Sequence, residues 1–406
     1  MMAAHSAVSA GAHVTLVERN EKVGRKLYIT GKGRCNLTNH CSGEEVLQNV
    51  PHNPKFLLRA MMQYPPEKTI EFFEGQGLTL KTERGNRVFP TSDKAADVID
   101  TLFYALKRKN VTFARDVVSH IETENGAVTG VTLESGAFLS ADRVILATGG
   151  ASYPLTGSTG DGYRMAEELG HKVNAPQGSL VPLVEDGEDC AQMQGLALKN
   201  VAVKVVNQKK KVVFSEFGEL LFTHFGLSGP VILSASAHMD HYEKNQYTVC
   251  IDLKPALDEK KLDERILRDF SENQNRAFAN ALGGLLPRLM IPVVVRRTGI
   301  PPETRVHDVT KAQRRALLET MKRFTVLIAA PRPVAEAIIT RGGVKVNEID
   351  PGSMASKKCR GLYFAGELID VDAYTGGFNL QIAWATGHMA GTHAAQDVLE
   401  TEEENE

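Results

Sequence analysis

The chain has 406 residues, enough for two or three domains with a large hydrophobic core. Its formal net charge of -2 and its 24% of charged residues are those of an ordinary soluble protein, so we expect no nucleic acid and no membrane among its partners. Its five cysteines include no C-x-x-C pair, which argues against a dithiol reductase or a zinc knuckle, predicts no metal site and fits a cytoplasmic location.

The N-terminal segment matches the second half of a dinucleotide-binding unit. Residues 2–10 predict a helix of small residues that ends at Gly11, and residues 13–17 predict a strand that ends at Glu18. In such units an acid at this position binds the adenosine ribose. The first strand and the G-x-G-x-x-G turn that normally precede this helix are missing from the sequence, so we expect an incomplete diphosphate site or a chain that starts late.

A glycine-rich basic loop follows this strand. Gly31 and Gly33 lie between Lys26 and Arg34, a pattern that suits a backbone lying close to a phosphate or a flat ring. Cys35 in the same loop is a candidate redox thiol, although no resolving cysteine is near in sequence and a role in close packing is favoured. Further on, residues 92–109 predict an amphipathic packing helix capped by Ser92 or Asp93.

The next segment predicts short strands. Residues 117–124, 127–134 and 137–140 alternate in polarity between turn residues and predict a small meander. Residues 143–148 predict a buried strand that ends in two glycines, at the carboxyl edge where ligands approach parallel sheets. A second glycine-rich turn at 157–162 leads into a helix at 163–169.

The pattern of predicted secondary structure changes at about residue 183. Strand-like runs surround a polar turn at 222–230, and residues 258–323 are mainly helical with several prolines. His224 in that turn is a candidate for proton transfer because imidazole titrates near neutral pH, although a structural role is the favoured interpretation. Three lysines at 209–211 predict a solvated hairpin tip rather than a binding patch.

The rest of the chain is organised around residues 361–391. A buried strand at 362–365 stops at Gly366 and Glu367, a polar loop follows, and Gly376-Gly377 opens a helix of small residues. A helix start presents unpaired N–H groups and a partial charge of about +0.5. Such a site suits a ligand with hydroxyls at one end and a delocalised anion at the other, as in reduced flavin. The tandem acids Glu367, Asp370 and Asp372 could hold a divalent metal, but ribityl binding is the better interpretation.

Five motifs occur in one order along the chain. They are T-G-K-G-R-C-N-L-T-N at 30–39, A-T-G-G at 147–150, G-S-T-G-D-G at 157–162, F-T-H-F-G-L-S-G-P at 222–230, and G-E-L-I-D-V-D at 366–372 with G-G-F-N-L-Q at 376–381. In this order they resemble the prokaryotic FAD-dependent oxidoreductases of the aminoacetone oxidase family, also called NAD(P)/FAD-dependent oxidoreductases. The resemblance covers essentially the whole chain, and residues 157–162 also resemble fumarate reductases and ketosteroid dehydrogenases.

The resemblance implies an α/β fold. It consists of a Rossmann-like FAD domain of the two-dinucleotide-binding type, with an inserted β-rich domain and a helical subdomain. We expect the FAD domain at residues 1–183 and 346–406, the β-rich insert at 184–257 and 324–345, and the helical subdomain at 258–323.

Carried over position by position, the resemblance also implies which residues contact FAD. Glu18 would hold the adenosine ribose, and Val118 would meet the adenine through its backbone. The diphosphate and flavin would lie along Lys26, Gly31, Gly33, Arg34, Cys35 and Asn36. Ala147, Thr148 and Gly149 would line the adenosine side, and Gly366, Glu367 and Asp370 the diphosphate and ribityl region. The helix start at the flavin pyrimidine would comprise Gly377, Phe378, Asn379, Leu380 and Gln381.

The function implied is a FAD-dependent oxidoreductase that transfers a hydride between the flavin and a small organic substrate. NAD(P)H or O₂ would be the second partner. NAD(P)H would use the substrate cleft transiently, because no second G-x-G-x-x-G unit is visible. The candidate catalytic residues are His224, Cys35 and Arg34. Two alternatives stay open: a non-catalytic flavin-binding redox sensor, and a truncated fragment that binds FAD weakly. The oligomeric state is not predicted.

Overall fold

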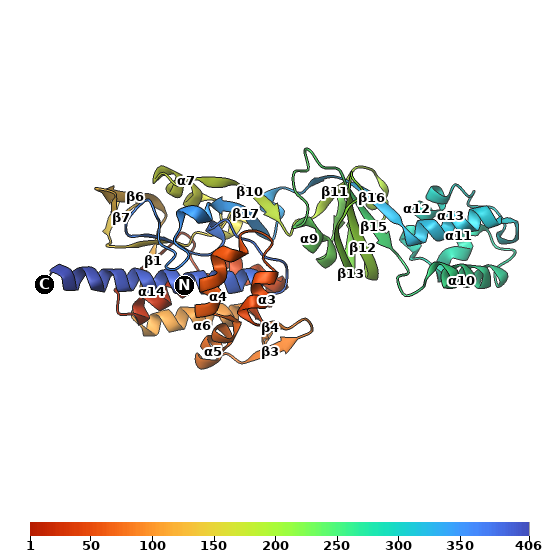
Figure 1. Ribbon diagram of the computed structural model, residues 1–406. Coiled ribbons are helices and arrows are strands. Elements are labelled where there is room, and N and C mark those ends of the chain that lie inside the picture. Colours follow the sequence, from red (N-terminus) through yellow and green to blue (C-terminus); the bar gives the residue numbers. More distant parts are fainter. Residues whose placement is uncertain (406) are drawn as a thin grey trace. The chain divides into compact units, whose positions relative to one another are not determined.

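The computed structural model describes residues 1–405, which form two compact units (Figure 1). The first unit comprises Met1–Ser179 and the C-terminal part of the chain from Val334 onward, and the second comprises Leu180–Pro333. Each unit has its own hydrophobic core. The predicted α/β fold is confirmed, and strands and helices from both ends of the described chain lie in the first unit. The finer division of the second unit into β-rich and helical parts stays a prediction.

Two pairs of parallel strands lie in the first unit. β1 (Thr15–Glu18) pairs with β5 (Thr112–Arg115), and β18 (Leu362–Phe364) pairs with β9 (Val144–Leu146). The three side chains of β18 are all buried, as expected for a short apolar strand of a parallel sheet. The carboxyl ends of β9 and β18 therefore meet at one edge, because paired parallel strands end side by side.

Two helices from opposite ends of the chain pack closely in this unit. α1 (Met2–Ser9) lies against α14 (Phe378–Asn405), and Figure 1 shows α14 as the long helix that ends at the C-terminus. A Cβ atom added to Gly391 would lie 2.1 Å from the carbonyl oxygen of Ala3, so only glycine fits there. The small residues of the predicted C-terminal helix therefore allow a close helix–helix contact.

The other elements of the first unit surround these strands. The predicted meander forms as β6 (Val118–Glu124), β7 (Ala127–Leu133) and β8 (Phe138–Ser140). A second antiparallel sheet contains β2 (Thr38–Asn39), β4 (Arg87–Pro90) and β3 (Leu80–Glu83), and a third contains β10 (Val173–Ser179) and β17 (Ile339–Val344). The remaining helices are α2 (Arg25–Ile29), α3 (Gly43–Gln48), α4 (Leu58–Gln63), α5 (Pro66–Gly75), α6 (Ala95–Arg108) and α7 (Asp161–Glu168).

The predicted cap of α6 is wrong. The helix forms with the expected buried face, including Leu102 and Leu106, but its N-cap residue is Lys94 and no side chain caps it. Asp93 adopts a left-handed backbone conformation with φ of 57°, and its carboxylate accepts a hydrogen bond from Lys81. The Asp93 carboxylate, which the sequence pattern predicted as a helix cap, therefore pairs with the Lys81 ammonium instead.

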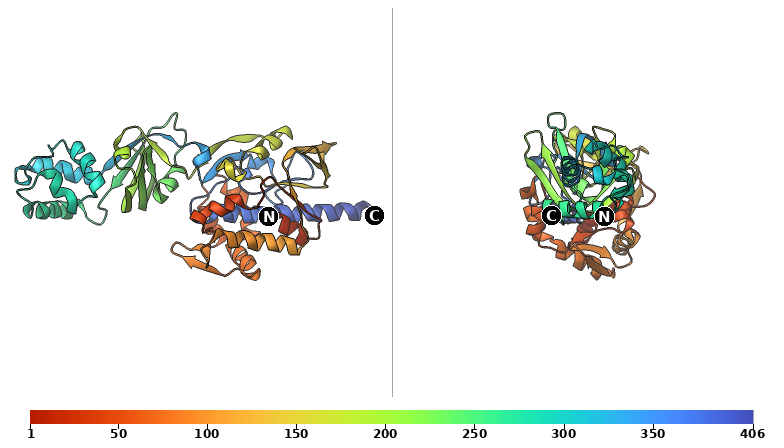
Figure 2. Two further views of the ribbon diagram at one scale, coloured as in Figure 1. Left: turned by 180° about the vertical axis from the view of Figure 1, so that it is seen from behind. Right: turned by 90° about the vertical axis from the view of Figure 1, so that its right-hand side faces the viewer.

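The second unit contains a closed six-stranded barrel and a group of helices. Around the barrel, neighbouring strands are β11 (Leu183–Glu185), β14 (Gly226–Ser228), β13 (Val212–Thr223), β12 (Ala197–Asn207), β15 (Tyr247–Asp252) and β16 (Phe324–Pro331), all antiparallel. Its helices are α8 (Asp189–Gln192), α9 (Pro230–Ser236), α10 (Glu259–Ser271), α11 (Phe278–Ala281), α12 (Ile291–Thr298) and α13 (Lys311–Lys322). Within this unit, the views of Figure 2 show α10–α13 grouped at one end of the barrel.

The three lysines at 209–211 lie at the turn between β12 and β13, where the Lys210 N–H donates to the Asn207 carbonyl over 2.8 Å, so the predicted hairpin tip is confirmed. Among the residues that the structure describes, no helix has both the length and the apolar character needed to cross a bilayer.

Candidate functional site

The paired ends of β9 and β18 bring two of the predicted cofactor motifs together. The Ala365 N–H donates to the Leu146 carbonyl over 3.0 Å, and the short helix Gly366–Leu368 then begins with Gly366 at a φ of 74°. A Cβ atom on Gly150 would lie 2.3 Å from the Thr340 hydroxyl oxygen and 2.9 Å from Glu367 Oε1. Glycine is therefore required where the two loops approach each other.

Glu367 is held by three segments of the chain. Its Oε2 lies 2.6 Å from Lys26 Nζ, while its Oε1 accepts hydrogen bonds from the Thr340 N–H at 2.6 Å and the Ser152 hydroxyl at 3.1 Å. Lys26 Nζ also donates to the Ser152 hydroxyl over 2.7 Å. The Lys26 and Glu367 side chains are only 22% and 16% exposed, so the ion pair is weakly screened by water. A cation and an anion therefore stand in fixed positions at the end of β18.

Two buried polar atoms in the predicted cofactor loops have no partner within the described part of the chain. They are the Thr148 hydroxyl oxygen, after β9, and Asn36 Oδ1, in the glycine-rich loop. Leaving a buried polar atom unpaired costs about 1–3 kcal/mol. Both positions are among those that the family resemblance assigns to FAD, and a ligand rich in hydroxyls and ring nitrogens would satisfy them. The residues present therefore fit FAD.

The glycine-rich loop turns sharply over a few residues. Gly31, Lys32, Gly33 and Cys35 all have positive φ values, between 57° and 83°. Burial raises the pKa of the fully buried Cys35 thiol to about 12. Because the thiolate is the reactive form of cysteine, this thiol is inert near neutral pH. The environment thus favours the packing role of Cys35 over the redox role.

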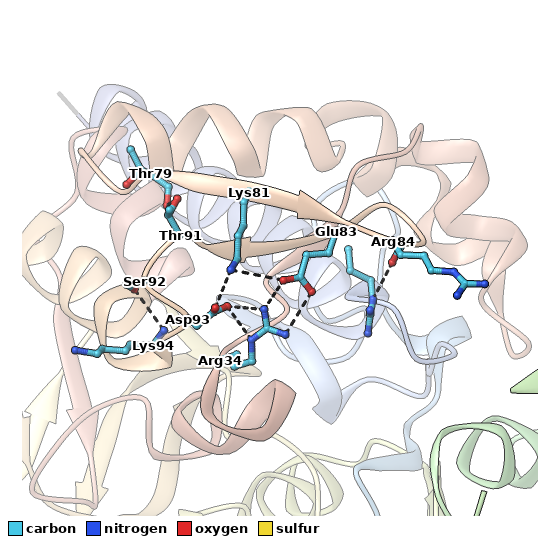
Figure 3. A network of polar contacts seen from close by, with 10 residues as sticks. Arg34, Thr79, Lys81, Glu83, Arg84, Thr91, Ser92, Asp93 and Lys94 are labelled. Atoms are coloured by element: carbon cyan, nitrogen blue, oxygen red, sulfur yellow. Dashed lines mark hydrogen bonds and ion pairs between the residues drawn. The ribbon is translucent and has the colours of Figure 1, made fainter. Parts of the chain in front are cut away.

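Arg34 connects this loop to the segments around β3 and α6, as Figure 3 shows. Its Nε donates to Asp93 over 2.7 Å, and its guanidinium also bonds Glu83. Lys81 Nζ lies 2.7 Å from Asp93 and 3.6 Å from Glu83. Hydrogen bonds to Glu83 and Asp93 raise the pKa of Arg34, and its guanidinium stacks 4.2 Å from the centre of the Phe89 ring. Since these partners already use its donors, Arg34 holds the loop in place, and its catalytic role stays a prediction.

The start of α14 is held in place by contacts with other segments of the first unit. Gly377 has a φ of 99°, and a Cβ atom there would lie 2.4 Å from the Thr38 carbonyl oxygen. The Asn379 side chain bonds both the N–H and the carbonyl of Ala373, at 2.9 and 2.7 Å. The fully buried Gln381 side chain bonds Thr38, Thr69 and the Tyr64 carbonyl. These two side chains fix the helix start, so the predicted contacts of Asn379 and Gln381 with FAD would have to use their backbone.

The predicted adenosine end lies at the carboxyl ends of β1 and β5. Glu18 Oε1 accepts hydrogen bonds from the backbone and side chain of Asn20, at 2.8 and 2.7 Å. The Asp116 N–H donates to the Glu18 carbonyl over 3.2 Å, and Val118 begins β6 two residues later. The fold thus brings the segments of Glu18 and Val118 together, while their contacts with the nucleotide stay predictions.

The acids after Glu367 bind protein groups. Asp370 accepts a hydrogen bond from Asn174 Nδ2 at 2.6 Å. Asp372 is fully buried, with its Oδ1 2.7 Å from His52 Nδ1 and its Oδ2 2.7 Å from the Ser179 hydroxyl. His52 and Ser179 were not among the predicted site residues, and they lie 320 and 193 residues away from Asp372 in the sequence. No local pattern signals such a pairing.

His224 lies in the second unit. It is exposed in the turn between β13 and β14, where its ring contacts that of Phe225 at a centroid distance of 5.0 Å. The Thr223 hydroxyl closes this turn by bonding the Gly226 carbonyl over 3.0 Å. The role of His224 in proton transfer stays a prediction.

Comparison with known proteins places this site in a family. The family model of the HI0933-like protein Rossmann domain matches residues 1–393. The chain is 30% identical over 388 residues to the 3-dehydro-bile acid delta(4,6)-reductase of Clostridium scindens, covering 95% of this chain and 93% of that protein. It is also 30% identical over 394 residues to the ribosomal RNA dihydrouridine synthase of Escherichia coli, covering 96% and 93%. Among solved structures, Escherichia coli quinol fumarate reductase shares the fold, with a TM-score of 0.50 and 18% identity over 98% of this chain and 69% of that one.

The expectation that nucleic acid is excluded as a partner is wrong. Two relatives, from Escherichia coli and Haemophilus influenzae, are named for acting on ribosomal RNA. The expectation rested on the net charge of -2, which averages over the whole chain. Residues 258–323 alone contain 14 lysines and arginines against 9 acids. A nearly neutral chain can therefore carry a basic region, and net charge gives no ground for the exclusion.

The motif order, the fit of the strand ends to FAD and the comparisons agree. The family model covers nearly the whole chain, and the two relatives match at least nine-tenths of the length of this chain. The resemblance expected from the motifs is thereby confirmed: the chain belongs to the HI0933-like family of FAD-dependent Rossmann oxidoreductases.

Proposed function

We propose that this protein is a FAD-dependent reductase of carbon–carbon double bonds conjugated with a carbonyl group, with NADH or NADPH as the source of electrons. Two relatives that match the chain over nearly its full length support this reaction class. One is named as a reductase of the delta(4,6) double bonds of a 3-dehydro bile acid. The other is named for making dihydrouridine, the form of uridine in which the conjugated ring double bond is reduced. The substrates differ, but both names describe the same bond chemistry.

The observation that carries the proposal is the arrangement at the ends of β9 and β18. Lys26 and Glu367 stand in fixed positions 2.6 Å apart, and in the predicted cofactor loops the Thr148 hydroxyl and the Asn36 amide each have a buried polar atom without a partner in the described chain. When bound and reduced, FAD supplies the hydride for such a reaction. In this proposal Lys26 and Glu367 orient the diphosphate and ribityl region. The start of α14 at Gly377 would present its partial positive charge to the flavin pyrimidine.

The test uses the full chain reconstituted with FAD under anaerobic conditions. NADH or NADPH is added first, and bleaching of the flavin absorbance reports electron transfer from the donor. A conjugated 3-oxo bile acid or unmodified ribosomal RNA is then added, with a saturated 3-oxo bile acid as the control. We expect the flavin colour to return with a conjugated substrate and not with the saturated control.

Three other outcomes would overturn the proposal. A colourless protein after addition of FAD would remove the cofactor. Flavin that no donor reduces would favour a redox sensor. Reduced flavin that reacts with O₂ but with neither conjugated substrate would favour an oxidase.

A further inference from the structure

A histidine, an aspartate and a serine form a connected set in the first unit. The carboxylate of Asp372 is fully buried, its Oδ1 lies 2.7 Å from His52 Nδ1, and the Ser179 hydroxyl donates to its Oδ2 over 2.7 Å. The His52 side chain is 31% exposed. The His52 side chain is thus partly open to solvent, while its Nδ1 is held by a carboxylate that is closed off from solvent.

Other histidine–carboxylate pairs in the described residues lack this asymmetry. Three are exposed on both sides: His120–Glu168, His241–Glu243 and His307–Asp308. In His171–Glu348 the imidazole itself is fully buried and the carboxylate is 11% exposed. A buried acid behind a partly exposed imidazole is the arrangement that fixes a ring in one orientation and stabilises its protonated form.

Asp372, which His52 and Ser179 contact, belongs to the segment 366–381 that is predicted to contact FAD. Asp372 falls between Glu367 and the start of α14 at Gly377. The Tyr374 N–H donates to the Asn49 carbonyl over 3.0 Å, and Asn53 Nδ2 donates to the Asp370 carbonyl over 2.7 Å. Residues 49–53 therefore run beside residues 370–374, and His52 is held against the loop that leads into the helix start.

We propose that His52 is the proton donor of the reduction and that Asp372, fixed by Ser179, positions its imidazole. This inference rests on the proposed function. The β-carbon of the conjugated double bond receives the hydride, for which the reduced flavin is the reductant. The α-carbon receives the proton, as an imidazolium N–H bond breaks and a C–H bond forms. The neutral imidazole then regains a proton from solvent, to which His52 is exposed.

The titratable groups around His52 favour it over its neighbours for this role. Asp370 and Asp372 are acids engaged in hydrogen bonds with Asn174, Ser179 and His52. Burial and the charge of Asp372 raise the pKa of the half-buried Tyr374 hydroxyl, which makes it a poorer acid near neutral pH. Imidazolium is the group in this set whose ordinary pKa suits proton donation at pH 6 to 8, taking the reference value of about 6.5.

The test compares His52→Gln with wild type in two half-reactions. Reduction of bound flavin by NAD(P)H should change less than about twofold, because it needs no proton from His52. Reoxidation by the conjugated substrate should slow by about 10²-fold or more, and its decline with rising pH should disappear. Asp372→Asn should slow the same half-reaction by about tenfold or more. His241→Gln, from an exposed pair in the second unit, should leave both half-reactions unchanged.

A second readout needs neither flavin nor substrate. In the protein without FAD, the ring N–H proton shared between His52 and Asp372 should give a downfield proton NMR signal that is absent from both His52→Gln and Asp372→Asn. If wild type reduces a conjugated substrate and His52→Gln does so at the same rate, the assignment of His52 is wrong while the proposed function stands. If wild type reduces no conjugated substrate, the proposed function itself fails.

Discussion

The carboxylate of Glu367 links the end of β18 to residues far away in sequence. Its partners are Lys26, Ser152 and Thr340, at 2.6 to 3.1 Å. Glutamine at position 367 would keep the shape of the side chain but leave the partly buried Lys26 ammonium without its anion. Removing one partner of such a pair costs more than the pair itself contributes, because the remaining charge stays poorly solvated.

We therefore expect Glu367→Gln to lower the free energy of unfolding by about 1–3 kcal/mol and to weaken FAD binding. Urea unfolding and titration of FAD fluorescence measure the two effects. The matched control is Glu71→Gln, which removes the exposed ion pair with Lys68 at 2.7 Å and should cost much less, because water screens that pair. Equal losses in the two variants would show that the Lys26–Glu367 pair has no special role.

Cys35 gives a second prediction at the scale of one residue. Its thiol is fully buried, and burial raises its pKa to about 12. The thiol therefore stays protonated at neutral and mildly alkaline pH. We expect a maleimide reagent not to label Cys35 in the folded protein at pH 8, and to label it fully in urea. Peptide mapping by mass spectrometry identifies which cysteines are labelled. Labelling of Cys35 itself in the native protein at neutral pH would contradict the packing role and favour the redox role.

At the scale of one element, the start of α14 depends on Gly377. Alanine there would be strained at a φ of 99°, and its Cβ would lie 2.4 Å from the Thr38 carbonyl oxygen. We expect Gly377→Ala to lower the free energy of unfolding by about 2 kcal/mol or more and to weaken FAD binding. At Gly75, in the last turn of α5, an added Cβ atom would meet nothing within 4 Å, so Gly75→Ala should be neutral or slightly stabilising. Similar unfolding midpoints for the two variants would contradict the steric argument.

The packing of α1 makes stability depend on pH. His5 in α1 stacks edge-on against Phe72 at 4.9 Å, and burial, with Lys109, His388 and Arg108 nearby, lowers the pKa of His5 to about 4. In the unfolded chain the pKa of a histidine is about 6.5, so the unfolded state binds more protons between these values. The neutral, buried His5 therefore contributes its full share of the folding stability above about pH 6.5. That contribution is lost as the pH falls towards 4, because protonation favours the unfolded chain.

We expect His5→Gln to reduce the loss of stability between pH 7 and pH 5. Urea unfolding of both proteins at the two pH values measures the difference in slope. Part of the slope should remain in the variant, because burial also lowers the pKa of His388 on α14. Identical slopes in wild type and variant would show that His5 is not the group responsible.

At the scale of the whole molecule, the two separate hydrophobic cores predict two unfolding events. The strand ends and helix start assigned to FAD all belong to the first unit. A ligand stabilises the unit that binds it by about 2.7 kcal/mol at a concentration 100 times its dissociation constant. Differential scanning calorimetry should therefore show two transitions, of which FAD raises one. A single transition that moves as a whole with FAD would contradict the independence of the two cores.

Local patterns in the sequence were sufficient for most elements and for the family. The buried strand at 362–365, the meander, the hairpin tip at 209–211 and the amphipathic face of α6 follow from hydrophobic periodicity and turn residues, which act between near neighbours. The glycine pairs at 149–150 and 376–377 mark positions of close approach: in the structure Gly150 lies against the Thr340 side chain and Gly377 against the Thr38 backbone. Five such motifs in order identify the cofactor fold.

Tertiary structure alone decided which polar groups meet. Asp93 pairs with Lys81 and Arg34 instead of capping α6, Glu367 pairs with Lys26 across 341 residues, and Asp372 pairs with His52 across 320. Each pairing joins residues from separate elements that only the folded chain brings together, and spacing along the chain carries no record of it. The net charge led to the wrong exclusion of nucleic acid for the same reason: a sum over the chain does not describe where the charges lie. The sequence thus specifies the cofactor and the family, whereas the candidate proton donor emerges only from the folded arrangement.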